Sequence, residues 1–193
     1  MTDVRTIGSW LSDASRTVAS LDADAVARAI TALVQVRERG GTVFTAGNGG
    51  SALTASHLAL DLQKAARPDG RGTRAVALSD SVGLITAWAN DVDYDRVFAE
   101  QLLVLAEPGD GLVVFSVSGS SPNLIALLEA ARERGVVSVG ILGGDGGKAR
   151  PLVTHAVVVP SPDYGWVESA HLVLEHVITY SLRGEPAVLG APG

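Results

Sequence analysis

Two glycine- and serine-rich stretches stand out among the residues that could do chemistry. One reads GNGGS at residues 47–51, and the other reads SVSGSSPN at residues 116–123. The second offers four serine hydroxyls and leads into a helical pattern that begins near Pro122. Free amides at a helix N-terminus bind anions and hydroxyls add neutral donors, so this stretch favours a phosphate ligand. The alternative is a turn that caps the helix, with Ser121 as N-cap before a proline at N1.

Histidines and acidic residues form two further pairs. His57 and Asp61 are four residues apart, so on a helix their side chains share one face. Glu168 and His176 are eight apart, about two turns, and can point into the same space, although His171 competes with His176. The chain has no cysteine, so a metal must take histidine, carboxylate or amide ligands. A lone histidine on an apolar helix is more often a core or interface residue, which leaves a metal site open at this point.

The elements that position these residues follow an alternating pattern. Apolar, β-branched runs begin at residues 42, 74, 111, 136 and 155, and helical patterns separate them. Such runs predict a parallel sheet that is covered on both faces. The fold class is therefore α/β, a doubly wound five-stranded parallel sheet with two N-terminal helices at about 3–20 and 22–39. In the strand order 2-1-3-4-5, the two glycine- and serine-rich stretches face each other across one crevice.

Composition limits the classes of function. The chain has 193 residues, 47% of them hydrophobic, and a net charge of −6. We expect one domain over 1–193, with an N-terminal helical segment at 1–40 and a mobile tail at 183–193. The negative charge and the lack of a basic run argue against nucleic-acid and membrane-surface partners. No targeting pattern and no run of about 18 apolar residues is found, so we expect a cytoplasmic protein.

Four blocks of sequence carry a family resemblance. They read AGNGGSALTASHLALDL from residue 46, ALSDSVGLITAWANDVDYDRVFAEQL from 77, GDGLVVFSVSGSSPNLIALLEAARERG from 109 and GILGGDGGKARPL from 140. These blocks resemble the phosphoheptose (sedoheptulose-7-phosphate) isomerases of the sugar isomerase (SIS) family. The resemblance implies the five-stranded SIS sheet, a homotetramer with active sites at subunit contacts, and conversion of sedoheptulose 7-phosphate to D-glycero-D-manno-heptose 7-phosphate.

The resemblance also implies roles for individual residues. Substrate contacts fall on Asn48, Gly49, Gly50, Ser51, Asn90, Asp91, Ser116, Val117, Ser118, Ser121 and Glu168. One zinc ion per subunit is implied, with ligands at His57, Asp61, Glu168 and His176. In proton transfer through a cis-enediol, the resemblance makes Asp61 the base and His176 the acid.

The sequence departs from the family pattern at four of its positions. A hydroxyl is lost at Val117, the family's glutamate is shortened to Asp61, and Trp166 and Glu168 stand where arginine and glutamine are common. These departures leave the exact phosphosugar and the metal open. The alternative function is a non-catalytic module, either a phosphosugar-binding regulator or a tetrameric adaptor resembling a replication-initiator-associating protein. A pure scaffold has no need of the histidine and carboxylate pairs, which favours the enzyme.

Overall fold

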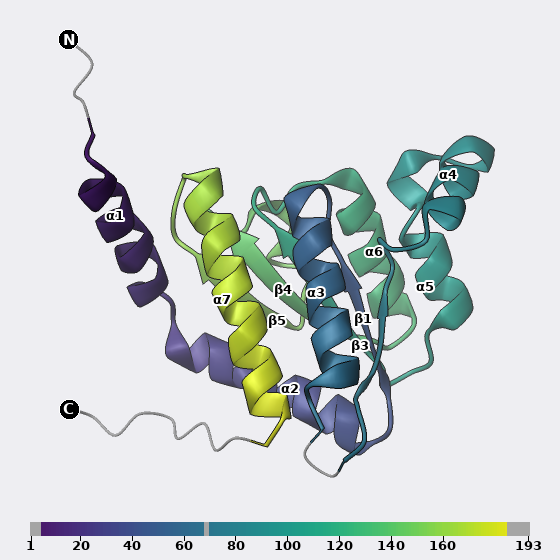
Figure 1. Ribbon diagram of the computed structural model, residues 1–193. Helices are drawn as coiled ribbons and strands as arrows, with labels where there is room; N and C mark the ends of the chain where they lie inside the picture. Colours follow the sequence, from purple (N-terminus) through teal and green to yellow (C-terminus); the bar gives the residue numbers. More distant parts are fainter. Residues whose placement is uncertain (1–4, 68–69, 185–193) are drawn as a thin grey trace.

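A computed structural model of the chain describes residues 5–67 and 70–184. Its centre is a parallel sheet in the order β2-β1-β3-β4-β5 (Figure 1). The strands are β1 Thr42–Ala46, β2 Arg74–Ala77, β3 Gly111–Ser116, β4 Val137–Gly143 and β5 His155–Val159. The predicted fold class, the five strands and their order are therefore confirmed.

Helices cover the two faces of this sheet. They are α1 Ile7–Ala19, α2 Ala23–Glu38, α3 Gly50–Lys64, α4 Val82–Asp91, α5 Ala99–Leu105, α6 Pro122–Glu133 and α7 Tyr164–Leu182, with short 3-10 turns η1 Tyr94–Arg96 and η2 Gly147–Ala149. Side chains of α2, α3 and α7 share one apolar core with the sheet, and side chains of α5 and α6 share a second. The sheet is thus the middle layer of three.

The covering of both faces explains why the strands read as unbroken apolar runs. Val113 and Phe115 of β3 belong to the core under α3 and α7, whereas Leu112 and Val114 belong to the core under α5 and α6. All the residues of β3 are buried. A strand buried on both sides needs apolar residues at successive positions, because neither face meets water.

The helix ends follow local side-chain chemistry. Asp22 caps α2, as predicted, and its carboxylate accepts hydrogen bonds from the N–H groups of Asp24 and Ala25 at 3.0 Å. The predicted first helix began at about residue 3, and residues 3 and 4 lie outside the described part, as do residues 185–193 of the predicted tail. A single domain over 1–193 stays a prediction. Among the described residues, no helix combines the length and apolarity needed to span a bilayer.

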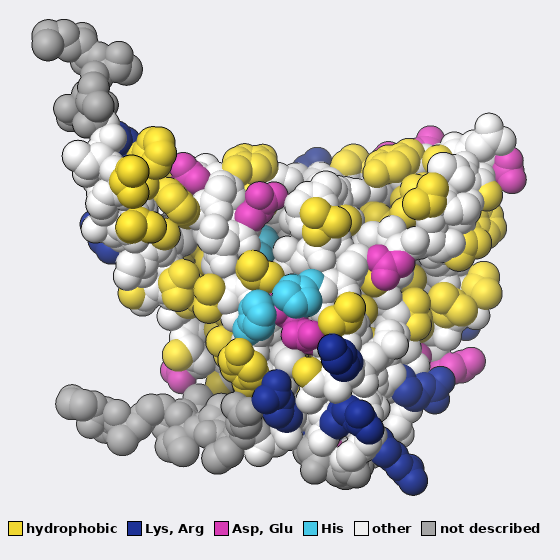
Figure 2. Space-filling model, in the orientation of Figure 1, with side chains coloured by type: hydrophobic (Ala, Val, Ile, Leu, Met, Phe, Trp, Pro, Cys, Tyr) yellow, Lys and Arg dark blue, Asp and Glu magenta, His cyan; other side chains and the backbone are white. Residues whose placement is uncertain are grey.

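Two helices pack weakly against the body of this chain. Neither α1 nor α4 has a buried residue, and both extend from the sheet and its covering helices (Figure 1). Their exposed apolar side chains include Ile7, Trp10 and Leu11 on α1 and Val82 and Leu84 on α4. Apolar side chains are visible on both in the space-filling view (Figure 2). Exposed apolar surface on two projecting helices is typical of a contact with another molecule.

Candidate active site

The loops after β1 and β3 meet at one edge of the sheet, because these strands pair in parallel from Val43↔Gly111 to Ala46↔Val114. A cavity of about 240 Å³ lies between them. Its lining includes, among the predicted substrate contacts, Asn48, Ser51, Ser116, Val117, Ser118, Ser121 and Glu168, and in addition Phe115, Leu124 and Tyr164. The structure thus places most of the predicted substrate residues in one cavity, at the edge where ligands bind in open α/β sheets.

The loop before α6 is held in a fixed shape. Ser116 Oγ accepts a hydrogen bond from the Gly119 N–H at 3.0 Å, and the Ala149 N–H donates to the Gly119 carbonyl at 2.8 Å. Gly119 has φ +58°, and a Cβ there would lie 2.1 Å from the Gly146 carbonyl oxygen. Only glycine fits this position, which fixes the backbone amides of the loop before any ligand arrives.

Ser121 bears on the two explanations of this loop. It occupies the N-cap position of α6, but its side chain makes no capping hydrogen bond. In contrast, the side chain of Asp163 caps α7 by accepting from the Trp166 N–H at 3.1 Å. The capping alternative is therefore not seen at Ser121. The hydroxyl and the first amides of α6 are left without a side-chain cap, as an anion site requires.

Asn123, which the sequence reasoning missed, joins the two loops. Its side-chain amide donates to Asn48 Oδ1 at 2.9 Å, and the Asn48 amide donates to Asn123 Oδ1 at 2.9 Å. Asn123 is only 2% exposed, and the Tyr94 hydroxyl lies 3.5 Å from Asn48 Oδ1. This reciprocal pair fixes the side chain of a predicted sugar contact. An asparagine at the second position of a helix after a phosphate-type loop was the available signal.

Glu168 lies over the start of α3. A Cβ on Gly50 would come within 2.5 Å of Glu168 Oε1, so the approach of this carboxylate depends on glycine at that position. Gly49, just before it, has φ +54°. A negative group is favourable at the positive end of a helix dipole. Glu168 therefore lies both in the lining of the 240 Å³ cavity and over the N-terminus of α3.

Asn90 and Asp91 lie elsewhere in this chain. Both are exposed at the end of α4, where the Asn90 side-chain amide donates to Asp91 Oδ1 at 2.7 Å. Neither lines the 240 Å³ cavity. Because α4 itself projects from the body, the structure does not bring these two residues to the loops of the same chain, and their role as substrate contacts stays a prediction.

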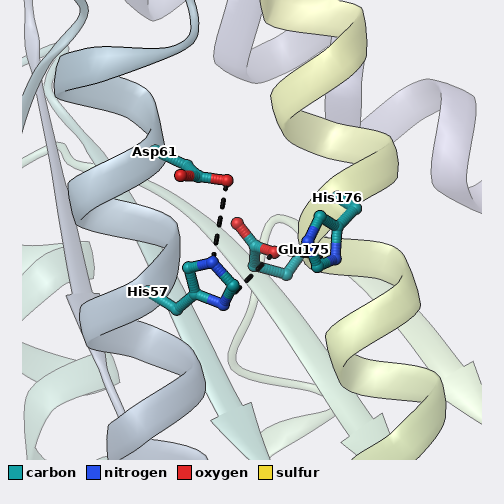
Figure 3. Close-up of side chains that lie close together, drawn as sticks. All are labelled: His57, Asp61, Glu175 and His176. Atoms are coloured by element: carbon teal, nitrogen blue, oxygen red, sulfur yellow. Dashed lines mark ion pairs between the residues drawn. The ribbon is translucent and has the colours of Figure 1, made fainter.

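A second cluster lies farther along α3, where it faces α7. His57 and Asp61 of α3 and Glu175 and His176 of α7 point toward one another (Figure 3). Each of them offers one ligand atom, and these atoms all lie within 4.8 Å of one another. Histidine side chains reach the surface here, beside acidic and basic ones (Figure 2). An open hollow of about 710 Å³ adjoins His57.

The structure places Glu175, not Glu168, with the other three residues. Eight residues of helix rise about 12 Å, so Glu168 and His176 are well separated along α7, whereas Glu175 is adjacent to His176 in the chain. His171 also lies outside the group. It is wholly buried, its ring centroid lies 5.9 Å from that of Phe115, and burial lowers its pKa to about 4. The choice of His176 over His171 therefore agrees with the structure.

Glu175 is an unusual residue for the interior. It is 0% exposed, and burial raises the pKa of its carboxyl group. Oε1 accepts a hydrogen bond from the Thr179 hydroxyl at 3.2 Å, whereas Oε2 has no hydrogen-bond partner among the described residues. Oε2 lies 3.1 Å from His176 Nδ1 and 3.8 Å from His57 Nδ1. A buried carboxylate oxygen that faces two imidazoles, with a second carboxylate nearby, fits a divalent cation.

The sequence contained a signal for Glu175. It lies on the buried face of α7, with His171 one turn before it and Thr179 one turn after. A charged residue at an apolar position of an amphipathic helix is uncommon, because burying an unpaired charge is costly. Glu175 was missed because the ligands were sought from the family pattern rather than from this break in the helical pattern, and Glu168 as a metal ligand stays a prediction.

Comparisons with known proteins show the family of this chain. Residues 9–143 match the family described as SIS domain. A phosphoheptose isomerase of Pelobacter propionicus is 39% identical over 146 residues, which cover 76% of this chain and 77% of that protein. The solved structure of a phosphoheptose isomerase from Neisseria gonorrhoeae has a TM-score of 0.86 at 28% identity and covers 92% of this chain and 97% of that chain. One from Francisella tularensis has a TM-score of 0.87 at 27% identity, with 93% and 97% covered.

The fold, the two loops and the family match define the class: this chain belongs to the SIS domain family. Within that family, its relatives and solved neighbours place it in the phosphoheptose isomerase branch.

The Asn48–Asn123 pair can be tested by a double-mutant cycle. Asn48→Ala and Asn123→Ala should each lower the free energy of unfolding, because each leaves the partner amide unpaired. The double variant should be more stable than the sum predicts, by about 0.5–3 kcal/mol, as for other residues in direct contact. Asn90→Ala combined with Asn123→Ala is the control and should be additive. Additive losses for Asn48 and Asn123 in urea titrations would show that the two loops are not coupled.

Proposed function

We propose that the protein is a phosphosugar ketose–aldose isomerase that converts sedoheptulose 7-phosphate to D-glycero-D-manno-heptose 7-phosphate. One observation carries this proposal: the chain has both a serine-rich loop at the start of α6, which lines a cavity, and a histidine–carboxylate group on α3 and α7. The first suits a phosphate and the second suits proton transfer. The relatives named above are phosphoheptose isomerases over most of this chain's length.

The phosphate would lie at the α6 N-terminus. The loop amides, together with the hydroxyls of Ser51, Ser116, Ser118 and Ser121, supply donors without a lysine side chain. Val117 has no hydroxyl, but its backbone amide remains as a donor. Glu168 and Asn48 lie in the same cavity and suit the sugar hydroxyls. The Glu168 carboxylate can accept hydrogen bonds from hydroxyls, and the Asn48 amide can donate and accept them.

The reacting carbons would lie farther along α3. Ten residues, or about 15 Å of helix, separate Ser51 from Asp61, and helical side chains lean toward the N-terminus, which shortens this span. A long substrate with its phosphate at one end and its carbonyl at the other suits such an arrangement.

Because α4 projects from the body, Asn90 and Asp91 are proposed to contact the substrate from a neighbouring subunit.

The proposed reaction needs one base and one acid. Asp61 removes a proton from C1 of the open-chain ketose while His176 protonates the carbonyl oxygen on C2, which gives the cis-enediol. Asp61 then returns its proton to C2, and His176 takes the proton from the oxygen on C1, which gives the aldose. His176 Nδ1 lies 2.9 Å from the Leu172 carbonyl oxygen, and this contact orients the imidazole ring.

A metal ion forms part of this proposal. Zinc, one per subunit, would be held by His57, Asp61 and His176, and when bound it polarises the substrate carbonyl. The buried Glu175 oxygen between the two imidazoles supports the fit of this group to a divalent cation. The non-catalytic regulator or adaptor is not favoured, because the relatives are isomerases and a scaffold does not need this group.

We further propose a homotetramer with active sites at subunit contacts, located in the cytoplasm. The exposed apolar side chains of α1 and α4, together with those of α7 at Leu172, Val173, Val177 and Tyr180, support assembly. Closed assembly would bury surface that one chain cannot cover. Light scattering at micromolar concentration should give the mass of four chains, and a monomer would contradict the proposal.

The phosphate site is tested by Ser121→Ala. The KM for sedoheptulose 7-phosphate should rise at least about tenfold, because a hydrogen bond to a charged group contributes about 1.5–3 kcal/mol. The free energy of unfolding should hardly change, since the Ser121 hydroxyl makes no capping bond. The variant that combines Ser118→Ala and Ser121→Ala should have a still higher KM.

Asp22→Ala is the matched control, because Asp22 does cap its helix. It should lower the free energy of unfolding by about 1 kcal/mol and leave KM unchanged. If Ser121→Ala instead lost stability and kept its KM, the loop would be a helix cap and the phosphate assignment would be wrong.

A further inference from the structure

Glu175 raises a question that the isomerase reaction does not answer. Its carboxylate is wholly buried, and it faces the side chains of His57 and His176 and, across the gap between the helices, that of Asp61 (Figure 3). Two carboxylates that contribute to one cluster repel each other, and the repulsion grows where water is excluded. A bound cation would relieve this repulsion.

The geometry of Glu175 points to a cation rather than to a hydrogen-bonded pair. Oε1 is already held by the Thr179 hydroxyl, which turns Oε2 toward the histidines. Oε2 has no hydrogen-bond partner among the described residues although His176 Nδ1 is 3.1 Å away, because that nitrogen is aligned with the Leu172 carbonyl at 2.9 Å. Oε2 is thus directed into the space between the two imidazoles, 3.1 Å from His176 Nδ1 and 3.8 Å from His57 Nδ1.

We propose that the Glu175 carboxylate is a ligand of a divalent cation, beside two imidazoles and the Asp61 carboxylate. This inference rests on the metal part of the proposed function and not on the isomerase reaction. Two carboxylates balance the charge of a divalent ion, so the bound site is close to neutral in a partly buried place. Thr179 is a positioning residue that orients the ligand, as outer groups do at metal sites.

The same inference assigns a separate task to Glu168. The family resemblance made it a ligand, but its carboxylate lies over Gly50 and lines the substrate cavity. With Glu175 supplying the second carboxylate, Glu168 is free to contact the sugar. The two glutamates of α7 are therefore divided between metal and substrate, seven residues apart.

Zinc titration of the full-length chain, freed of metal with a chelator and followed by calorimetry, tests this assignment without turnover. The unaltered protein should bind one Zn²⁺ per chain. Glu175→Gln, which keeps the shape of the side chain, should weaken binding at least about tenfold, since even outer groups contribute that much. Glu168→Gln is the matched control and should keep the affinity. Thr179→Val should weaken binding less than Glu175→Gln does.

Unfolding with and without zinc separates a ligand from a structural ion pair. In chelator, Glu175→Gln should be at least as stable as the unaltered protein, because a buried charge has been removed. With saturating zinc the order should reverse, because bound ligand stabilises only the protein that binds it tightly. Thr179→Val supplies the same comparison if Glu175→Gln fails to fold.

Three results would overturn the assignment. The first is the absence of zinc binding by the unaltered protein. The second is loss of affinity in Glu168→Gln with affinity kept in Glu175→Gln. The third is a Glu175→Gln protein that is less stable in chelator and unchanged in zinc affinity, which would make Glu175 the partner of protonated histidines. Isomerase activity enters none of these measurements, so failure of the proposed reaction would be seen separately.

Discussion

β1 and β3 pair in parallel over Val43↔Gly111 to Ala46↔Val114, and the rest of the site depends on this pairing. Parallel neighbours end at the same edge of the sheet, so the loop that starts α3 and the loop that starts α6 lie side by side there. The reciprocal amides of Asn48 and Asn123 then join the two loops. A slip of this register would separate the proposed phosphate donors from the proposed sugar contacts, because each loop is anchored to its own strand.

The direction of α3 extends this arrangement away from the sheet edge. Its first turn lines the substrate cavity, and its later turns carry His57 and Asp61 against α7. The contact between α3 and α7 depends on their shared core, in which Leu58 and Leu62 of α3 pack with Leu174 and Ile178 of α7. Apolar packing thus holds the polar cluster in place, which explains how a buried carboxylate can be kept beside two histidines. Fold and chemistry meet at the same two helices.

The sequence allowed the sheet to be predicted because its central strands β1, β3 and β4 are almost wholly buried and read as apolar runs. The position of Ser116, Ser118 and Ser121 at the sheet edge was also predictable, since they follow a strand and precede a helix that starts with proline. Glu175 was not predicted, because its role depends on the packing of α3 against α7 and not on spacing within one helix. Asn123 was missed for a similar reason: its partner Asn48 is 75 residues away in the chain.

The account depends most on Asp61 acting as a base rather than as part of a scaffold. Turnover of sedoheptulose 7-phosphate by Asp61→Asn, measured as aldose formation at matched zinc content, tests this directly. We expect kcat at least about a hundredfold below that of the unaltered protein, since general acid–base groups contribute about 10²–10⁴-fold. Substrate binding should persist, because the phosphate loop is untouched. Full activity of Asp61→Asn would contradict the mechanism and return the scaffold interpretation to first place.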